Sequence, residues 1–492
     1  MFEAAETGHT IDERTFERDL PALREALVNA QYDLSESRTC AVAILVNGVD
    51  GAGKGETVNL LNTWMDPRYI RVHGIGPATE EERQRPDLWR FWRILPPRGR
   101  ISFLIGSWYT QPILERAYGR SGRGEFERNL RELNRFEKML SDEGVLLLKL
   151  WFHLSKKRQR ARLEGLSAER ETRWRVTKAD WQHFRMYDRF VRVCGEALRE
   201  TSTAEAPWLV VDGSDWRYRS MTVARTMLEA IRGRLKVARR PPSAPRYPVL
   251  LPALDGEEII ERLDLTRTLA KKDYQRRLER QQGRLAVLTR HKGFRRLPVV
   301  VVFEGFDAAG KGSAIRRVTE ALDARLYTIV PISAPSEEER AQPYLWRFWR
   351  HLPRRGAVTV FDRSWYGRVL VERVEGLCTP SDWARAYGEI NDFEEQLVAH
   401  GTVLVKFWLH VSADEQLRRF KERQTTSFKR FKITREDWRN REKRPAYEAA
   451  VGDMVARTST EIAPWTLVAA EDKPFARVKV LKTLCDRLEA AL

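Results

Sequence analysis

The 492-residue chain contains the same sequence pattern twice. Residues 46–55 read VNGVDGAGKG and residues 303–312 read FEGFDAAGKG, so that Lys311 minus Lys54 gives an offset of 257 residues. The offset holds without a gap for further motifs: LWRFWR at 88–93 and 345–350, FE at 136–137 and 393–394, and PW at 207–208 and 464–465. Similarity at one fixed offset over this length predicts two copies of one domain.

A proline-rich segment separates the two copies. Residues 239–248 read RRPPSAPRYP, and this density of proline prevents regular secondary structure. We therefore predict an N-terminal domain at 1–236, a linker at 237–256 and a C-terminal domain at 257–492. Each domain is then of ordinary size for one hydrophobic core.

Each copy has the pattern of an α/β domain. Charged stretches of helical period separate four short apolar runs in the second copy, at 297–303, 357–361, 402–409 and 464–468. Runs that are apolar throughout are typical of parallel strands covered on both faces. A charged helical stretch precedes each core, from Thr15 to Leu34 and from Asp273 to His291. The sequence predicts, for each copy, a doubly wound parallel sheet flanked by helices.

A glycine-rich loop follows the first of these runs. Residues 305–311 read GFDAAGK and fit the phosphate-loop pattern G-x-x-x-x-G-K between a predicted strand and a helix that begins near Lys311. The N–H groups of such a loop cradle phosphate at a helix N-terminus, and the lysine reaches the oxygens of the transferred group. We expect phosphate to contact Lys311 and the loop residues Gly305, Ala308, Ala309, Gly310, Gly312 and Ser313. The motif predicts a P-loop NTPase fold.

The usual metal ligand of such a loop is missing. Gly312 stands where a serine or threonine normally binds Mg²⁺, so another residue has to hold the ion. Ser313 is one candidate. Asp307 in the loop and Asp362 after the 357–361 run are better ones, because they offer the carboxylate oxygens that Mg²⁺ prefers. The alternative for Asp362 is a helix N-cap.

Arginines follow two of the later runs. Residues 362–368 read DRSWYGR, and the Arg363 guanidinium could grip phosphoryl oxygens or form a surface ion pair. Basic and aromatic residues then fill 418–438, where kinases of this shape carry a helical lid that closes on the phosphate donor. A solvated helix face is the alternative for that segment. We therefore expect arginines from two segments near the phosphate loop.

Taken together, these motifs resemble the polyphosphate kinase 2 family. They are G-x-D-x-x-G-K-G at 305–312, DRSWYGR at 362–368, and F-x-x-R at 420–423 ahead of KRFK at 429–432. The resemblance covers nearly the whole chain, and the two copies are similar to the fused two-domain class of the family. It implies a thymidylate-kinase-like fold and transfer of the terminal phosphate of inorganic polyphosphate to AMP, which gives ADP.

The resemblance also implies roles for single residues. Asp307 and Asp362 would hold Mg²⁺. Lys311 and Arg363 would bind the transferring phosphate, and Arg423 would reach it from the lid. Further phosphate contacts are expected from three more basic residues, Arg368, Lys429 and Arg430.

The first copy departs from the motifs outside its phosphate loop. The loop itself keeps Gly48, Asp50, Gly53 and Lys54. The other positions have changed: Ile105 for Asp362, Gly106 for Arg363, Gln111 for Arg368, Leu166 for Arg423 and Thr172 for Lys429. Because each lost electrostatic group typically costs about 10²–10³ in rate, we predict that the first copy is catalytically inactive.

The WRFWR segment at 346–350 is identical at 89–93 in the first copy. Since its counterpart persists in a copy predicted to be inactive, structural packing is one interpretation. Binding of the acceptor nucleotide by Arg347 or Arg350 is the other. Glu372, matched by Glu115, has the same two interpretations.

Composition limits the remaining possibilities. The formal net charge of +18 favours polyanionic partners, and no apolar run approaches the roughly 18 residues that a membrane span needs. The acidic N-terminus is unlike a secretory signal, and the four cysteines lie too far apart for a disulfide frame or a zinc site. We expect a cytoplasmic homo-oligomer that binds neither nucleic acid nor membrane.

Two other functions compete with phosphate transfer from polyphosphate. An ATP-dependent nucleotide kinase would share the fold but would need an adenine clamp for its donor. A non-enzymatic polyanion-binding protein would use the net positive charge. It has no use for the carboxylates of Asp307 and Asp362, which weaken phosphate binding unless a metal bridges them.

Overall fold

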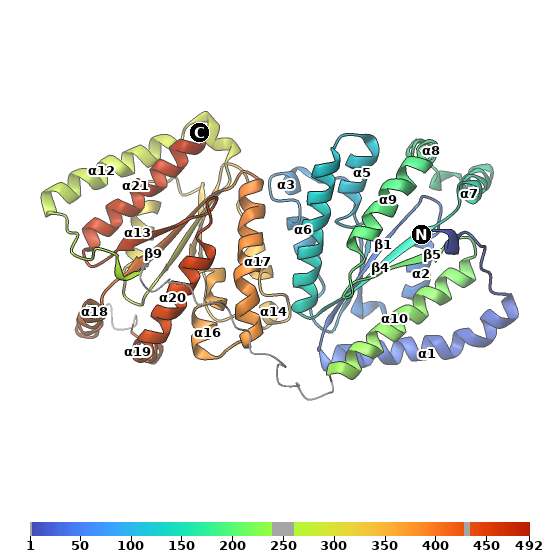
Figure 1. Ribbon diagram of the computed structural model, residues 1–492, viewed down its shortest axis with the longest axis horizontal. Helices are drawn as coiled ribbons and strands as arrows, with labels where there is room; N and C mark the ends of the chain where they lie inside the picture. The colour runs from blue at the N-terminus through green and yellow to red at the C-terminus, as the bar shows by residue number, and fades with distance from the viewer. Residues whose placement is uncertain (1, 239–259, 428–432) are drawn as a thin grey trace. The chain divides into compact units, whose positions relative to one another are not determined.

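The computed structural model describes residues 2–238, 260–427 and 433–492. The chain divides into two compact units, the first carrying strands β1–β5 and the second β6–β10 (Figure 1). Residues 78–89 group with the second unit and residues 335–346 with the first. From residue 239 onward, the predicted linker lies outside the described residues, and the domain bounds predicted from the sequence stay a prediction.

Each unit is built on a five-stranded parallel sheet. In the first unit the strands are, in spatial order, β2 (Ile70–Gly74), β3 (Ile101–Ile105), β1 (Ala41–Gly48), β4 (Val145–His153) and β5 (Trp208–Asp212). In the second unit they are β7 (Tyr327–Pro331), β8 (Val358–Asp362), β6 (Val299–Gly305), β9 (Val403–His410) and β10 (Trp465–Ala469). Strand pairing also keeps the offset of 257, because Val42 pairs with Ile101 as Val299 pairs with Val358. The prediction of a tandemly duplicated P-loop NTPase fold is confirmed.

Helices flank both sheets (Figure 1). Those before residue 239 are α1 (Glu13–Ser37), α2 (Lys54–Trp64), α3 (Glu80–Arg83), α4 (Trp89–Trp92), α5 (Thr110–Tyr118), α6 (Arg123–Asp142), α7 (Lys156–Ala168), α8 (Lys178–Arg185), α9 (Tyr187–Thr201) and α10 (Trp216–Ala238). The later ones are α12 (Lys271–Leu288), α13 (Lys311–Thr319), α14 (Glu337–Arg340), α15 (Trp346–Trp349), α16 (Val371–Glu375), α17 (Pro380–Ala399), α18 (Ala413–Thr425), α19 (Arg435–Glu442), α20 (Arg444–Thr458) and α21 (Lys473–Ala491). The bounds of α18, α19 and α20 equal those of α7, α8 and α9 plus 257 at both ends, so the copies share the local structure around the predicted lid.

The core of each unit forms where the sequence is apolar throughout. All side chains of β6 from Val299 to Phe303 are buried, as expected for a central parallel strand. The charged helices ahead of each core are confirmed as α1 and α12, which pack against α10 and α21 respectively. Within the described parts of the chain, no helix combines the length and the apolar character that a membrane crossing requires. The cysteines are free thiols, three of them buried and Cys378 half-buried.

A buried ion pair supports the turn that follows β8. Lys406 on β9 and Glu394 on α17 lie 2.6 Å apart, and their side chains are 0% and 1% exposed. The Lys406 ammonium also donates to the Tyr366 hydroxyl and to the Thr458 carbonyl, while Glu394 accepts from Tyr366 and from the Trp365 indole. The first unit repeats this network with its own five residues, Lys149, Glu137, Tyr109, Thr201 and Trp108. Its presence in both units indicates a structural role.

Aromatic side chains of the repeated WRFWR segment belong to the same buried layer. Phe348 lies 5.8 Å from Trp365 and Trp349 lies 5.0 Å from Phe393, measured between ring centroids. The first unit shows the equivalent contacts of Phe91 with Trp108 and of Trp92 with Phe136. This packing favours the structural interpretation for the aromatic residues of the segment.

Candidate active site

The phosphate loop of the second unit joins β6 to α13. The strand ends at Gly305 and the helix begins at Lys311, as the motif predicts. Ala308 and Gly310 adopt left-handed backbone conformations, with φ of 61° and 109°. Among the described residues, the N–H groups of Gly310, Lys311 and Gly312 make no hydrogen bond. Unpaired N–H groups at the positive end of a helix form a binding site for an anion such as phosphate.

The loop lysine is held over its own loop. The Lys311 ammonium donates to the carbonyls of Gly305, at 2.6 Å, and Phe306, at 3.3 Å. Burial lowers the pKa of Lys311, and the neighbouring Arg363 guanidinium acts in the same direction. Three carboxylates, those of Asp307, Asp362 and Glu304, oppose this shift. Lys311 therefore lies at the centre of the charged groups of the site.

Asp307 is held from two sides. Its carboxylate accepts a hydrogen bond from Arg363 at 2.6 Å and another from the Asn440 amide at 2.9 Å. Burial raises the pKa of Asp307, but the charges of Arg363 and Lys311 and these hydrogen bonds outweigh it and leave the pKa below its ordinary value. Arg363 has a φ of 62°, so the chain turns sharply after β8 and brings its guanidinium back to the loop. The structure thus places the Arg363 guanidinium beside the phosphate loop.

Asp362 is the last residue of β8 and is half-buried. In the part of the chain that the structure describes, its carboxylate takes part in no hydrogen bond or ion pair. No cluster of three or more His, Cys, Asp or Glu side chains that could hold a metal occurs in the described ranges. Near Lys311, the groups that could bind a metal are the carboxylates of Asp307 and Asp362, whose oxygens are hard ligands. This set suits a cation such as Mg²⁺, which keeps several waters when it is bound by one or two carboxylates.

Glu304 is a third acid at the site, which the sequence motifs did not identify. It is 2% exposed, and its carboxylate accepts a hydrogen bond from the Ser364 hydroxyl at 2.8 Å. Burial raises the pKa of Glu304 above its ordinary value, although Arg363 and Lys311 act against the shift. Glu304 therefore helps to position Ser364, the residue next to Arg363.

Arg419 on α18 fixes the outer side of the phosphate loop. One guanidinium nitrogen donates to the carbonyls of Ala308 and Ala309, at 2.9 and 3.0 Å, and another donates to the carbonyls of Ala470 and Glu471, at 2.7 and 2.8 Å. The side chain is 2% exposed. Because these loop carbonyls are turned toward Arg419, the opposite side of the loop is left for its N–H groups.

The remaining predicted residues divide into three groups. Arg423 lies on α18, and its side chain is half-buried. Burial lowers its pKa while the carboxylates of Asp437 and Asp307 act in the opposite direction, so it lies within electrostatic reach of the loop. Arg368 and Glu372 pair with each other at 2.9 Å. Lys429 and Arg430 lie outside the described residues.

Three further predicted residues lie at the edges of the site. The Ser313 hydroxyl donates to the Gly310 carbonyl at 3.0 Å and accepts from Arg477 at 3.3 Å. Arg347 lies over the Phe348 ring, 5.6 Å from its centroid, and Arg350 is exposed.

The first unit contains the same loop with different surroundings. Lys54 donates to the carbonyls of Gly48 and Val49, both at 2.8 Å, as Lys311 does in the second unit. Asp50 accepts a hydrogen bond from His183 at 2.8 Å, because His183 occupies the position of Asn440. No arginine of this unit takes the place of Arg363, since β3 is followed by Gly106. The structure therefore repeats the phosphate loop without a counterpart of Arg363 and with His183 in place of Asn440.

The sequence pattern of the polyphosphate kinase 2 family matches residues 10–239 and 268–492. A protein of Pseudomonas aeruginosa named polyphosphate:AMP phosphotransferase is 55% identical over 491 residues, which are 100% of this chain and 99% of that protein. A protein of the same name from Acinetobacter johnsonii is 37% identical over 94% of this chain and 95% of its own length. The crystal structure of a protein assigned to polyphosphate kinase 2 from Pseudomonas aeruginosa superimposes with a TM-score of 0.91 at 54% identity, covering 100% of this chain and 99% of that one. This chain belongs to the polyphosphate kinase 2 family.

Proposed function

We propose that the chain is a Mg²⁺-dependent polyphosphate:AMP phosphotransferase that transfers the terminal phosphate of inorganic polyphosphate to AMP. The observation that carries the proposal is the match, over both copies, to full-length relatives named for this reaction. The second unit supplies the groups that such a reaction needs: a phosphate loop, two carboxylates that would hold Mg²⁺, and Arg363. We further propose that residues 257–492 form the catalytic domain and residues 1–236 an inactive one.

The proposed reaction is a direct displacement. A phosphate oxygen of AMP forms a bond to the terminal phosphorus of polyphosphate, and the bond from that phosphorus to the bridging oxygen of the chain breaks. The products are ADP and a polyphosphate shorter by one unit, so no covalent enzyme intermediate is needed. Catalysis then consists of positioning and of stabilising the charge on the transferred group.

Residues of the second unit divide this work. The N–H groups of the loop bind the donor phosphates, and Lys311 exchanges its loop carbonyls for phosphoryl oxygens. Arg363, held by Asp307, directs its remaining N–H groups at the transferred phosphate. Asp307 and Asp362 would hold Mg²⁺, which neutralises charge on the phosphoryl oxygens when it is bound. Arg423 approaches from α18, so that it closes the cationic ring around the donor.

The test compares donors for AMP. With Mg²⁺, AMP and polyphosphate but without ATP, we expect ADP to accumulate, as measured by ion-exchange chromatography of the nucleotides. ATP in place of polyphosphate should give far less ADP, because the cationic groups on α18 suit a long anionic donor. Efficient transfer from ATP alone would favour the ATP-dependent nucleotide kinase. No ADP from either donor, with polyphosphate still retained by the protein, would favour the non-enzymatic polyanion-binding protein.

A matched pair of arginine variants tests the role of Arg419. Arg419→Gln leaves four backbone carbonyls without their charged donor, and each such hydrogen bond is worth about 1.5–3 kcal/mol. We therefore expect kcat/KM for polyphosphate to fall by at least about tenfold, the equivalent of one such bond. Initial rates at varied polyphosphate concentration measure the effect.

Arg162→Gln is the control for this pair. Arg162 occupies the same position in the first unit but is 41% exposed and pairs with Glu56 at 2.8 Å. We expect it to leave kcat/KM within about twofold of the unaltered enzyme, because exposed ion pairs contribute little. Equal losses in both variants would contradict the assignment of the second unit as the catalytic one.

A further inference from the structure

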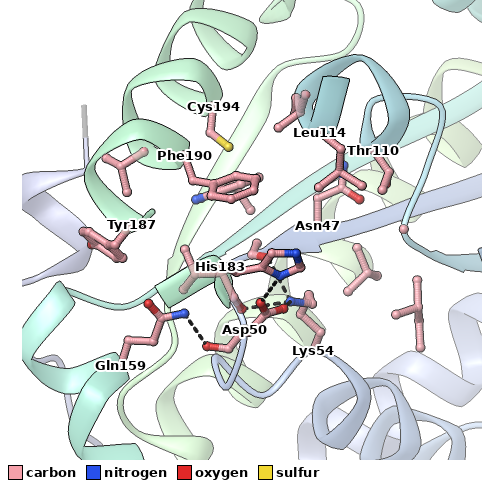
Figure 2. A pocket seen from close by; sticks show the side chains of 18 of the residues that line it. Asn47, Asp50, Lys54, Thr110, Leu114, Gln159, His183, Tyr187, Phe190 and Cys194 are labelled. Atoms are coloured by element: carbon pink, nitrogen blue, oxygen red, sulfur yellow. Dashed lines mark hydrogen bonds and ion pairs between the residues drawn. The ribbon is translucent and has the colours of Figure 1, made fainter. Parts of the chain in front are cut away.

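The first unit has a cavity at the place where the second unit has its active site. It measures about 320 Å³ and lies at the carboxyl ends of β1 and β3, with further lining residues from α8 and α9 (Figure 2). This volume falls in the range of small-molecule sites, and the end of a parallel sheet is a common location for them. The cavity is therefore large enough to hold a ligand of its own.

Charge has been removed from this cavity relative to the second unit. Five charged residues of the second unit are replaced by uncharged ones: Glu304 by Asn47, Asp362 by Ile105, Arg363 by Gly106, Arg444 by Tyr187 and Glu448 by Val191. Apolar walls now surround the space, with Phe190 and Tyr187 from α9 on one side (Figure 2). The loss of both acidic and basic groups indicates a ligand that carries no charge.

The charges that remain are already paired within the protein. Asp50 binds His183 at 2.8 Å and lies 4.0 Å from Lys54. The hydrogen bond that His183 makes to the Asp50 carboxylate raises the pKa of His183, and the charges of Asp50 and Lys54 offset each other. These three side chains form the floor of the cavity in Figure 2. They leave little net charge to attract a phosphate.

An internal carboxylate further opposes anion binding at this loop. Glu56 stands at the start of α2, in the position of Ser313, and accepts hydrogen bonds from Arg162 at 2.8 Å, from Arg175 at 3.0 Å and from Arg219. The charges of these three arginines are thus neutralised in part by Glu56. Phosphate would have to displace Glu56 or approach its charge.

Hydrogen-bond acceptors without partners line the same cavity. Asn47 and Gln159 are 7% and 2% exposed, and among the described residues neither Asn47 Oδ1 nor Gln159 Oε1 has a hydrogen-bond partner. Their amide nitrogens are engaged, with Ser107 at 2.8 Å and with the Asp50 carbonyl at 3.0 Å. Buried acceptors normally have donors, so these oxygens indicate a ligand that supplies N–H or O–H groups.

We propose that the cavity of the first unit binds an uncharged nucleobase or nucleoside. Its heterocycle fits between the aromatic side chains of α9 and the apolar ends of the strands, and its N–H groups meet the unpaired amide oxygens. The phosphate loop then serves as a scaffold for the cavity rather than as a phosphate site. The first unit becomes a ligand-binding unit instead of a second catalytic one.

Calorimetric titration of the full chain tests the proposal. The probes are adenosine, guanosine, cytidine and uridine, with AMP and tripolyphosphate as charged comparators. We expect at least one nucleoside to bind with a stoichiometry of one per chain. Val191→Trp places a large side chain in the cavity and should weaken that binding by at least about tenfold, the equivalent of 1.4 kcal/mol. Glu448→Trp makes the same change at the equivalent position of the second unit and should leave it unaltered.

Three results would overturn the proposal. They are no binding of any nucleoside at millimolar concentration, nucleoside binding that Glu448→Trp weakens and Val191→Trp does not, and binding of tripolyphosphate that Val191→Trp weakens. If Val191→Trp does not fold, Cys194→Met adds volume deeper in the cavity with less disturbance, and the same comparison is made with it. None of these measurements uses turnover, so failure of the proposed phosphotransfer activity would leave the test intact.

Discussion

Asp362→Asn is expected to lower kcat for ADP formation by at least about 10²–10³. The substitution keeps the size of the side chain but removes the charge of the one site carboxylate that, among the described residues, has no protein partner. If Asp362 and Asp307 hold Mg²⁺ together, the loss should also raise the Mg²⁺ concentration needed for half-maximal rate. Initial rates at varied Mg²⁺ measure both effects.

The duplicated loop supplies the matched control. Lys311→Ala should cost at least as much as Asp362→Asn, because the loop lysine contacts the group that is transferred. Lys54→Ala changes the equivalent residue of the first unit, which has the same hydrogen bonds to its loop. We expect it to retain most of the activity. Equal damage from Lys54→Ala would mean that the first unit binds something the reaction requires.

The sequence was sufficient to predict the buried parts of the fold. Strands β6, β8, β9 and β10 lie where the apolar runs predicted them, within one or two residues at each end. Their residues are apolar because helices cover the sheet, and that physical requirement is visible in the sequence itself. The edge strand β7 was not predicted: its apolar run is short and contains Pro331, which disfavours a strand, and Thr328 and Ile329 are exposed.

The candidate site was predicted only where residues follow a motif. Lys311, Asp307 and Arg363 lie together in the structure, and their motifs place them on adjacent strand ends. Asn440 and Arg419 could not be assigned in this way, because they come from helices that approach the loop only after the chain has folded.

A comparison of the two copies identifies some of the residues that the motifs did not. Asn440 and Glu304 differ from their counterparts His183 and Asn47, so a position-by-position comparison beyond the motifs would have included them. Arg419 gives no such signal because Arg162 has the same identity. Arg162 has a different role because its guanidinium donates to Glu56 and not to the carbonyls of the loop.

Lys406→Met is expected to destabilise the second unit by about 3–5 kcal/mol, because it leaves Glu394 charged and buried without its partner. Lys149→Met should destabilise the first unit by a similar amount, since Glu137 has the same contacts there. Hydrogen exchange of peptides from β9 and from β4 reports the two units separately within the full chain. Exchange through unfolding should rise by about 10²–10⁴ in the unit that carries the substitution.

The same pair of variants distinguishes an effect on the stability of a unit from an effect on kcat. Tyr366 and Trp365, which donate to Glu394, lie in the turn that begins three residues after Asp362 and aims Arg363 at the loop. Lys406→Met should therefore lower kcat as well as stability, whereas Lys149→Met should change only the stability of its unit. Comparable kcat values for the two variants, measured where both remain folded, would contradict this. The ion pair would then hold the turn of each unit without any bearing on the position of Arg363.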